Sequence, residues 1–137
     1  MVRLDDPQRR FPKWNPPTFD KTGLTRWNWM CQNHEHLVLG RYVDIGAFTY
    51  INAKYGVVLE DLVQVGSHCS IYSISTIDNK KGKVVLKKNA RIGSHTVIMP
   101  GVTVGENSVV GALSYVKDDI PADCVAYGVP AKVVKKR

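Results

Sequence analysis

A run of aliphatic residues spaced six apart constrains the fold of this chain more than any other feature of its sequence. The series starts at Leu39, restarts at Leu59 after a two-residue slip, and restarts at Leu86 after a three-residue slip. An internal period of this kind is typical of proteins in which each repeat packs on the next. The positions are Leu39, Ile45, Ile51, Leu59, Val65, Ile71, Ile77, Leu86, Ile92, Ile98, Val104, Val110 and Val116.

The residues around each aliphatic position favour short strands joined by tight turns. Small or β-branched side chains such as Thr49, Cys69 and Ser75 stand four residues after it, and glycine often follows it directly, as at Gly66 and Gly93. A helix does not tolerate such a density of glycine, and a simple hairpin shows a period of two. We therefore predict an all-β fold, a parallel β-helix with three short strands in each coil.

Stacking of the coils gives specific expectations for the core and for the slips. All the aliphatic positions should point inward, because they fill the narrow core of the coil. Residues 54–56 and 79–82, which lie in the slips, should form exposed loops. The segments predicted to share one side of the prism start at Ile51, Ile71, Ile92 and Val110.

The first 36 residues do not repeat and are expected to cap the open end of the β-helix. Prolines at positions 7, 12, 16 and 17 argue against regular structure up to about residue 19, and a short helix is expected over residues 21–33. The unpaired edge of a β-structure needs covering, and Trp14, Trp27 and Trp29 are suited to this. The predicted divisions are a cap over 1–36, a β-helix over 37–127 and a basic exit segment over 128–137.

The net charge of +7 is concentrated in two short segments, residues 80–91 and 132–137. A surface for a nucleic-acid backbone would spread its positive charge more widely, so we expect no nucleic-acid partner. Two local clusters fit a small polyanion better, although a solvated lysine-rich surface is the alternative for each.

Other features bear on where the protein acts. No run of about 18 apolar residues exists, so we expect no membrane insertion, and the start MVRLDDPQRR lacks the apolar stretch of a secretory signal. Cys31, Cys69 and Cys124 are too scattered for a disulfide framework, and no CxxC pair suggests zinc. The expectation is a cytoplasmic protein without a metal site.

Two segments resemble a known family. Residues 92–121, IGSHTVIMPGVTVGENSVVGALSYVKDDIP, and the ending GVPAKVVKK resemble the sugar and nucleotide-sugar acetyltransferase branch of the hexapeptide-repeat acyltransferases. The resemblance covers roughly residues 37–134. It implies a left-handed β-helix, acetyl-CoA as the acetyl donor, and a homotrimer with its sites between subunits.

The resemblance also implies residues for binding coenzyme A. Ser94 matches a family position that contacts the pantetheine arm, and Ala112 matches one whose backbone N–H binds the same arm. Both stand two residues after an aliphatic position. Lysine makes effective point-charge contacts with phosphate, so we expect the lysines beyond the last coil to meet the phosphates of the coenzyme. These are Lys132, Lys135 and Lys136.

The family's O-acetyltransferases carry a catalytic histidine, followed by proline, at about Ser75 or Thr76, and this chain has no histidine there. A sugar hydroxyl needs a general base to attack a thioester, whereas an amine titrates nearer neutrality. The omission favours N-acetylation of an amino sugar on a nucleotide-linked sugar for surface glycan synthesis. Sugar O-acetylation is the alternative, and the sugar, its nucleotide and the position of the amine stay open.

Several polar residues are candidates for the acceptor site. His68 is the candidate catalytic residue because it shares a coil with the expected acyl end, and a hydrogen-bonded turn histidine is the alternative for it and for His95. The candidate substrate-binding residues, whose alternative is an ordinary surface turn, are His36, Asn52, Lys54 and Asp78.

Two other classes of protein share this fold. The γ-type carbonic anhydrases need three converging histidines, two of them five residues apart, and no such pair occurs here. The count of six also places His68 and His95 on different sides of the prism. A non-catalytic scaffold would leave the alignment of Ser94 with Ala112 and the basic exit unexplained.

Overall fold

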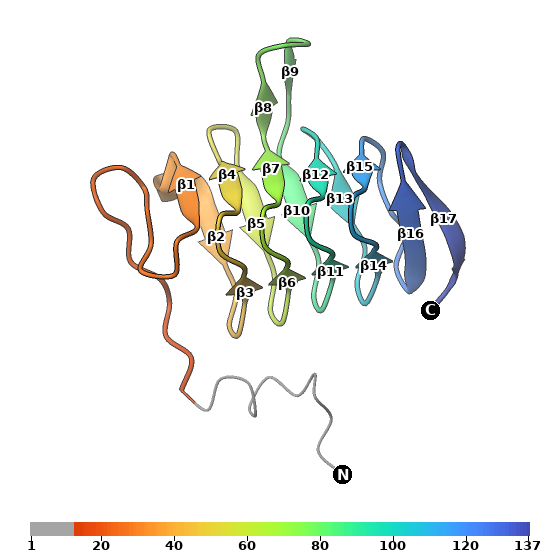
Figure 1. Ribbon diagram of the computed structural model, residues 1–137, viewed down its shortest axis with the longest axis horizontal. Helices are drawn as coiled ribbons and strands as arrows, with labels where there is room; N and C mark the ends of the chain where they lie inside the picture. Colours follow the sequence, from red (N-terminus) through yellow and green to blue (C-terminus); the bar gives the residue numbers. More distant parts are fainter. Residues whose placement is uncertain (1–12) are drawn as a thin grey trace.

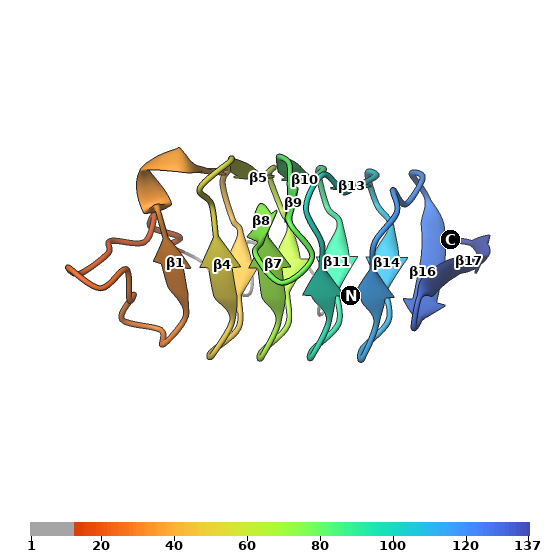
Figure 2. The same ribbon diagram turned by 90° about the horizontal axis from the view of Figure 1, so that it is seen from above.

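The computed structural model describes residues 13–137, which form a parallel β-helix with three sheets along its sides (Figures 1 and 2). Residues 1–12, with the first two prolines of the expected cap, lie outside the described residues. Each coil contributes one short strand to each sheet in turn, so strands of successive coils pair in parallel. The predicted all-β parallel architecture is confirmed.

The three sheets are called A, B and C here. Sheet A contains β1 (Met30–Gln32), β4 (Tyr50–Asn52), β7 (Ser70–Tyr72), β12 (Val97–Ile98) and β15 (Tyr115–Val116). Sheet B contains β2 (Leu37–Leu39), β5 (Val57–Leu59), β10 (Val84–Leu86) and β13 (Thr103–Val104). Sheet C contains β3 (Asp44–Ile45), β6 (Gln64–Val65), β11 (Arg91–Ile92), β14 (Val109–Val110), β16 (Cys124–Gly128) and β17 (Ala131–Lys136).

The aliphatic positions fill the core as predicted, with two departures. Ile51, Ile71 and Ile98 stack along sheet A with no exposed surface. Full burial of such a side chain stabilises the fold by about 1.5–3 kcal/mol relative to exposure. Leu39 is only half-buried, against the first coil, and the prediction for Ile77 is wrong because its side chain is 99% exposed.

Ile77 lies in a hairpin that leaves the β-helix between sheets A and B. Its strands, β8 (Ile74–Ser75) and β9 (Lys80–Lys81), pair antiparallel and project from the body of the protein (Figure 1). Residues 79–82 are therefore the far strand and base of this hairpin and not the simple loop that we expected. The other slip does form a turn, in which Lys54 and Tyr55 are exposed.

The hairpin shifts the count of six by one side of the prism. Because Ile77 is outside the core, the next buried position of the six-residue series after β7 is Leu86, which pairs with Leu59 in sheet B. The segments starting at Ile92 and Val110 therefore follow β11 and β14 in sheet C. The prediction that they share a side with the segments after β4 and β7 is wrong.

The capping segment closes the N-terminal end with two of its three tryptophans. Trp29 is buried in the core, and Trp14 packs against it while its Nε1 donates a 3.0 Å hydrogen bond to the carbonyl of Val43. Trp27 is 43% exposed and is not part of the buried core. No helix forms over residues 21–33, because β1 pairs with β4 of the first coil instead.

Helical structure is minor throughout the described residues. One short 3₁₀ turn, η1 (His34–His36), follows β1. Within residues 13–137, no helix is long and apolar enough to cross a membrane.

Candidate functional site

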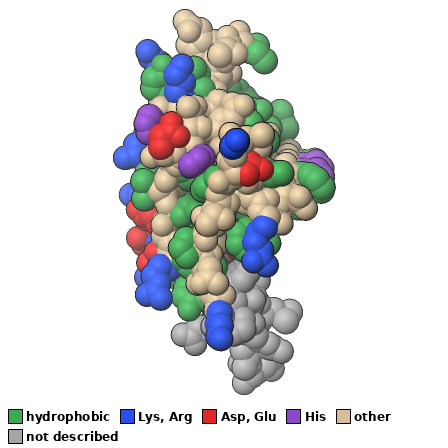
Figure 3. Space-filling view, turned by 90° about the vertical axis from the view of Figure 1, so that its left-hand side faces the viewer, with side chains coloured by type: hydrophobic (Ala, Val, Ile, Leu, Met, Phe, Trp, Pro, Cys, Tyr) green, Lys and Arg blue, Asp and Glu red, His purple; other side chains and the backbone are tan. Residues whose placement is uncertain are grey.

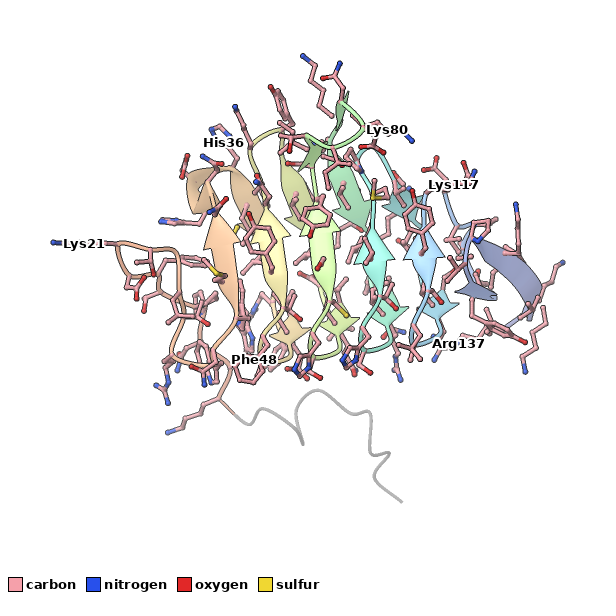
Figure 4. All side chains as sticks on the ribbon, turned by 45° about the horizontal axis from the view of Figure 1, so that its top comes forward. Lys21, His36, Phe48, Lys80, Lys117 and Arg137 are labelled. Atoms are coloured by element: carbon pink, nitrogen blue, oxygen red, sulfur yellow. The ribbon has the colours of Figure 1, made fainter. Side chains whose placement is uncertain are left out.

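Two corners border sheet A, and they differ in regularity. The C–A corner, between sheets C and A, places one residue of each coil at positive φ: Phe48, His68, His95 and Leu113, with φ of 58–65°. The A–B corner, between sheets A and B, contains the turn of residues 53–56 and the β8–β9 hairpin. Figure 4 shows Phe48 along one edge of the molecule and His36 and Lys80 along the opposite edge.

His68 and His95 stack face to face at the C–A corner. Their ring centroids are 4.7 Å apart with planes inclined by 5°, and the Phe48 ring lies 5.2 Å from His68. The backbone N–H of each histidine donates a 3.1 Å hydrogen bond to a carbonyl of the preceding coil. His68 bonds to Ala47 and His95 bonds to Ser67. The prediction that the two histidines fall on different sides of the prism is wrong, because it depended on the count that the hairpin shifts.

The stacked pair does not complete a metal site among residues 13–137. No group of three or more His, Cys, Asp or Glu side chains there could hold a metal ion. A γ-type carbonic anhydrase site requires three histidine ligands.

Ser94 and Ala112 lie one coil apart on the same C–A corner, as their spacing predicts. The N–H of Leu113 donates a 3.0 Å hydrogen bond to the Ser94 carbonyl. A Cβ at Gly93 would approach the Ala112 nitrogen to 2.5 Å, so glycine is needed for this close stacking. Ala112 is exposed, and its own N–H has no acceptor in the described part of the chain. It is therefore available to donate a hydrogen bond to a ligand at this corner.

The three C-terminal lysines are not equally near this corner. Lys132 pairs with Tyr127 across β16 and β17, and the Tyr127 side chain packs against Gly111 at the end of the C–A corner. Lys135 and Lys136 pair with the start of β16, roughly 10 Å further along the strand. All three side chains are exposed.

A hollow of about 420 Å³ lies where the hairpin meets sheet A. Tyr50 and Tyr72 line it from the sheet, with ring centroids 5.9 Å apart. The Tyr50 hydroxyl donates a 2.6 Å hydrogen bond to Gln32 Oε1, and burial raises the pKa of Tyr50, so the hydroxyl keeps its proton at neutral pH. The complete lining is Tyr50, Asn52, Tyr72, Ile74, Ser75, Thr76, Ile77, Asp78 and Met99.

The sequence analysis missed these tyrosines. Tyr50 precedes the aliphatic position Ile51 and Tyr72 follows Ile71, so both point outward from sheet A. Their alternation with buried isoleucines was the signal that could have identified them.

Two of the predicted substrate-binding residues, Asn52 and Asp78, line this hollow together. A hydrogen bond from Ser75 lowers the pKa of Asp78, and the ammonium of Lys80 lies 3.6 Å from its carboxylate. Asp78 is therefore a carboxylate at neutral pH. The hollow thus presents one negative charge and several hydroxyl and amide groups to a ligand.

The other two predicted substrate-binding residues lie beside the hollow, at the same A–B corner. His36 Nδ1 is 3.0 Å from the Lys54 carbonyl oxygen, which it contacts as a donor. The Lys54 N–H in turn donates a 3.1 Å hydrogen bond to Asn52 Oδ1. The structure therefore brings all four together at one border of sheet A, and His68, Ser94 and Ala112 at the other.

A second hollow, of about 440 Å³, lies at the N-terminal end between the capping segment and the first coil. Trp14, Trp27 and Trp29 line it, and none of the predicted site residues does. Figure 3 faces this end of the molecule and shows histidine side chains at two separate edges. We assign this hollow to the cap.

Comparison with known proteins identifies the repeat. Residues 83–118 match the family model described as bacterial transferase hexapeptide (six repeats). The galactoside O-acetyltransferase of Escherichia coli (strain K12) is 36% identical over 112 residues, which cover 71% of this chain and 55% of that protein. That of Lactococcus lactis is 34% identical over a similar stretch. The chain spans about half the length of the curated relatives it matches.

Solved structures share the same coil. A galactoside acetyltransferase in complex with coenzyme A superposes with a TM-score of 0.71 at 30% identity, over 79% of this chain and 58% of the other. AntD, an N-acyltransferase from Bacillus cereus in complex with dTDP and 3-hydroxybutyryl-CoA, gives 0.70 at 25% identity, over 83% and 79%. The predicted left-handed β-helix is confirmed.

Proposed function

We propose, from its membership of the hexapeptide-repeat transferases, that this chain transfers an acetyl group from acetyl-CoA to the amine of a nucleotide-linked amino sugar. The relatives support transfer from a coenzyme A thioester, and one similar structure supports a nucleotide-linked acceptor. One is named a galactoside O-acetyltransferase, and solved structures of similar proteins hold coenzyme A, or an acyl-CoA together with dTDP. The geometry of the two corners of sheet A indicates where each substrate would bind.

The donor would lie along the C–A corner. The exposed Ala112 N–H, which has no acceptor among the described residues, would bind a carbonyl of the pantetheine arm next to Ser94. Lys132, at the end of the same corner, would contact a phosphate of the coenzyme, with Lys135 and Lys136 further along the strand.

The acceptor would occupy the hollow under the hairpin. The observation that carries the N-acetyl assignment is that no histidine lies in this hairpin, residues 74–81, or anywhere in the lining of the hollow. A hydroxyl in that position would have no imidazole base of the same chain beside it, whereas an unprotonated amine attacks without a base and can give up its proton to His68 of a neighbouring copy afterwards. The Asp78 carboxylate would hold the substrate's ammonium form before it loses its proton.

The chemistry is acyl transfer between two bound substrates. The amine nitrogen attacks the thioester carbonyl and forms a C–N bond, and the tetrahedral oxyanion collapses with cleavage of the C–S bond. The thiolate of coenzyme A takes up a proton as it leaves. The imidazole of His68, exposed at the C–A corner, is proposed to receive the proton that the attacking amine loses.

We also propose that the functional unit is a homotrimer. Sheet B carries a column of outward-facing valines, in which Val38 pairs with Val58 and Val58 pairs with Val85. Val38 is 58% exposed, although valine in such a position favours burial. In one chain the C–A corner and the hollow lie at opposite borders of sheet A, so we propose that the C–A corner of one copy faces the hollow of its neighbour. A monomeric mass in light scattering at micromolar concentrations would contradict this assembly.

The direct test of the activity is a screen of nucleotide-linked amino sugars with acetyl-CoA, in which release of the coenzyme thiol is followed. The expected result is thiol release with at least one amino sugar and none with a neutral galactoside. Efficient acetylation of the galactoside instead would support O-acetylation, which the galactoside O-acetyltransferase relatives favour.

A further inference from the structure

Two lysine side chains meet at one aromatic ring on the A–B corner, outside the hollow. The Lys54 ammonium lies 5.8 Å from the centroid of the Tyr55 ring, and the Lys81 ammonium lies 5.4 Å from the same centroid. Lys54 comes from the turn after β4, and Lys81 comes from β9 of the hairpin. The fold therefore brings together two like charges from separate elements.

Neither ammonium has a carboxylate partner among residues 13–137. In the part of the chain that the structure describes, Lys54 and Lys81 form no ion pair, whereas the adjacent Lys80 pairs with Asp78. Both ammonium groups are positive and lie near one ring, so a polyanion bound at that ring would be attracted by both. A lysine ammonium is a point charge that contacts anionic groups such as phosphate, and the exposed Tyr55 side chain offers apolar surface beside it.

A buried serine fixes the two elements relative to each other. Ser73, which has no exposed surface, accepts a 3.0 Å hydrogen bond at Oγ from the Tyr55 N–H. Its Oγ donates a 2.7 Å hydrogen bond to the Asn52 carbonyl, and its own carbonyl accepts one of 2.9 Å from Gly82 at the base of the hairpin. The turn that carries Lys54 and the strand that precedes Gly82 are thus held by one residue.

The cluster also adjoins the hollow. Asn52 lines the hollow, and its side chain accepts the 3.1 Å hydrogen bond from the Lys54 N–H. The turn that carries Lys54 is therefore linked directly to the lining of the hollow, and a ligand that extends from the hollow along this corner would meet Lys54 and Lys81.

We propose that Lys54, Lys81 and Tyr55 form a binding site for the diphosphate of the acceptor. The inference rests on the proposed function for the identity of the acceptor, and it adds a specificity: the enzyme would select a sugar that carries a nucleoside diphosphate over a free sugar. Acetyl-CoA also contains a diphosphate, so the same chemistry could serve the donor, and the experiment separates the two sources.

The experiment measures binding of dTDP and of inorganic pyrophosphate to the full chain by isothermal titration calorimetry. The test variant is Lys54→Ala/Lys81→Ala, and the matched control is Lys87→Ala/Lys88→Ala, which removes two exposed lysines from the corner between sheets B and C. The dissociation constants for dTDP and pyrophosphate should rise at least about tenfold in the test variant and stay within about twofold in the control. Circular dichroism of both variants should match that of the unaltered chain.

Three results would overturn the inference: unchanged dTDP affinity in the test variant, an equal loss in the control, or no measurable dTDP binding by the unaltered chain. A fourth is a loss of coenzyme A affinity in the test variant with dTDP affinity intact, which would assign the lysines to the donor. The proposed function fails separately. If no amino sugar is acetylated while dTDP affinity depends on Lys54 and Lys81, the diphosphate site stands and the transfer reaction does not.

Discussion

The two corners that border sheet A differ because one repeats and the other is interrupted. At the C–A corner every coil places the same backbone conformation above the last, and side chains such as His68 and His95 stack at 4.7 Å, close to the spacing of paired strands. At the A–B corner the hairpin breaks the stack, and the hollow and the lysine cluster around Tyr55 lie beside it.

The difference shows what a β-helix can build at each kind of corner. At the regular C–A corner, hydrogen bonds between coils hold the backbone at a fixed separation. This corner offers an extended row of N–H groups and small side chains, which suits a long ligand. An insertion such as the β8–β9 hairpin supplies a second wall for a hollow, and a hollow suits a compact ligand.

The largest expected difference between the β-helix core and the β8–β9 hairpin is in the free energy of unfolding. Ile98→Ala should lower the free energy of unfolding by about 2–5 kcal/mol, because it opens a cavity in a fully buried stack. Ile77→Ala, in the exposed tip of the hairpin, should change it by less than about 0.5 kcal/mol. Urea denaturation of both variants checks this, and an equal cost at the two positions would show that Ile77 is a core residue.

Removal of the hairpin should strongly reduce activity with the acceptor and leave the β-helix folded. The Gly82 N–H already donates a 2.9 Å hydrogen bond to the Ser73 carbonyl, so an Asn-Gly turn can replace residues 74–81. The value of kcat/KM for the acceptor should fall at least about a hundredfold, since one wall of the hollow is lost. Coenzyme A affinity by calorimetry should stay unchanged. Retention of full activity would place the acceptor elsewhere.

Loss of the C-terminal charges should affect the donor alone. Replacement of Lys132, Lys135 and Lys136 by alanine should raise the apparent KM for acetyl-CoA about tenfold, from about 0.5–1 kcal/mol for each exposed phosphate contact. Lys132→Ala alone should account for most of the change, because Lys132 lies nearest the C–A corner. Initial rates at low salt measure this, with the KM for the acceptor as control. An unchanged KM would mean that these lysines are only a solvated surface.

The smallest effect is expected at the histidine stack. His68→Ala should lower kcat less than about tenfold, whereas removal of an obligatory general base costs about 10²–10⁴-fold. His95→Ala is the matched control, since it removes the stacking partner and leaves the His68 ring in place. A loss above a hundredfold in His68→Ala, together with a flattened acidic limb of the pH–rate profile, would make His68 an obligatory base.

The regular corner could be predicted from the sequence because it obeys one rule throughout. The period of six, the buried small residues such as Thr49 and Thr96, and the alignment of Ser94 with Ala112 all follow from coil-on-coil stacking. The prediction failed where Ile77 happened to fall at the sixth position. Isoleucine is also the residue type at buried positions such as Ile71 and Ile98, so spacing alone could not exclude Ile77 from the core.

The A–B corner needed three-dimensional information. The residues around Ile77, Asp78 and Asn79 among them, are typical of a turn, which is the only local sign of the hairpin. The contact of Lys54 and Lys81 with one ring joins positions 27 residues apart through an antiparallel pair that the repeat does not specify. The stacking of His68 on His95 was not predicted for the same reason, because His95 follows the hairpin that shifts the count of six.

The choice of nucleophile is tested most directly by comparing two acceptors that differ by one atom. A nucleotide-linked amino sugar and its hydroxyl counterpart are each incubated with acetyl-CoA, and thiol release is measured between pH 6 and 9. The account predicts that only the amine is acetylated efficiently, by a margin of at least about a hundredfold, and that its rate rises with pH towards the pKa of the substrate amine. Equal or faster acetylation of the hydroxyl sugar would contradict the N-acetyltransferase assignment.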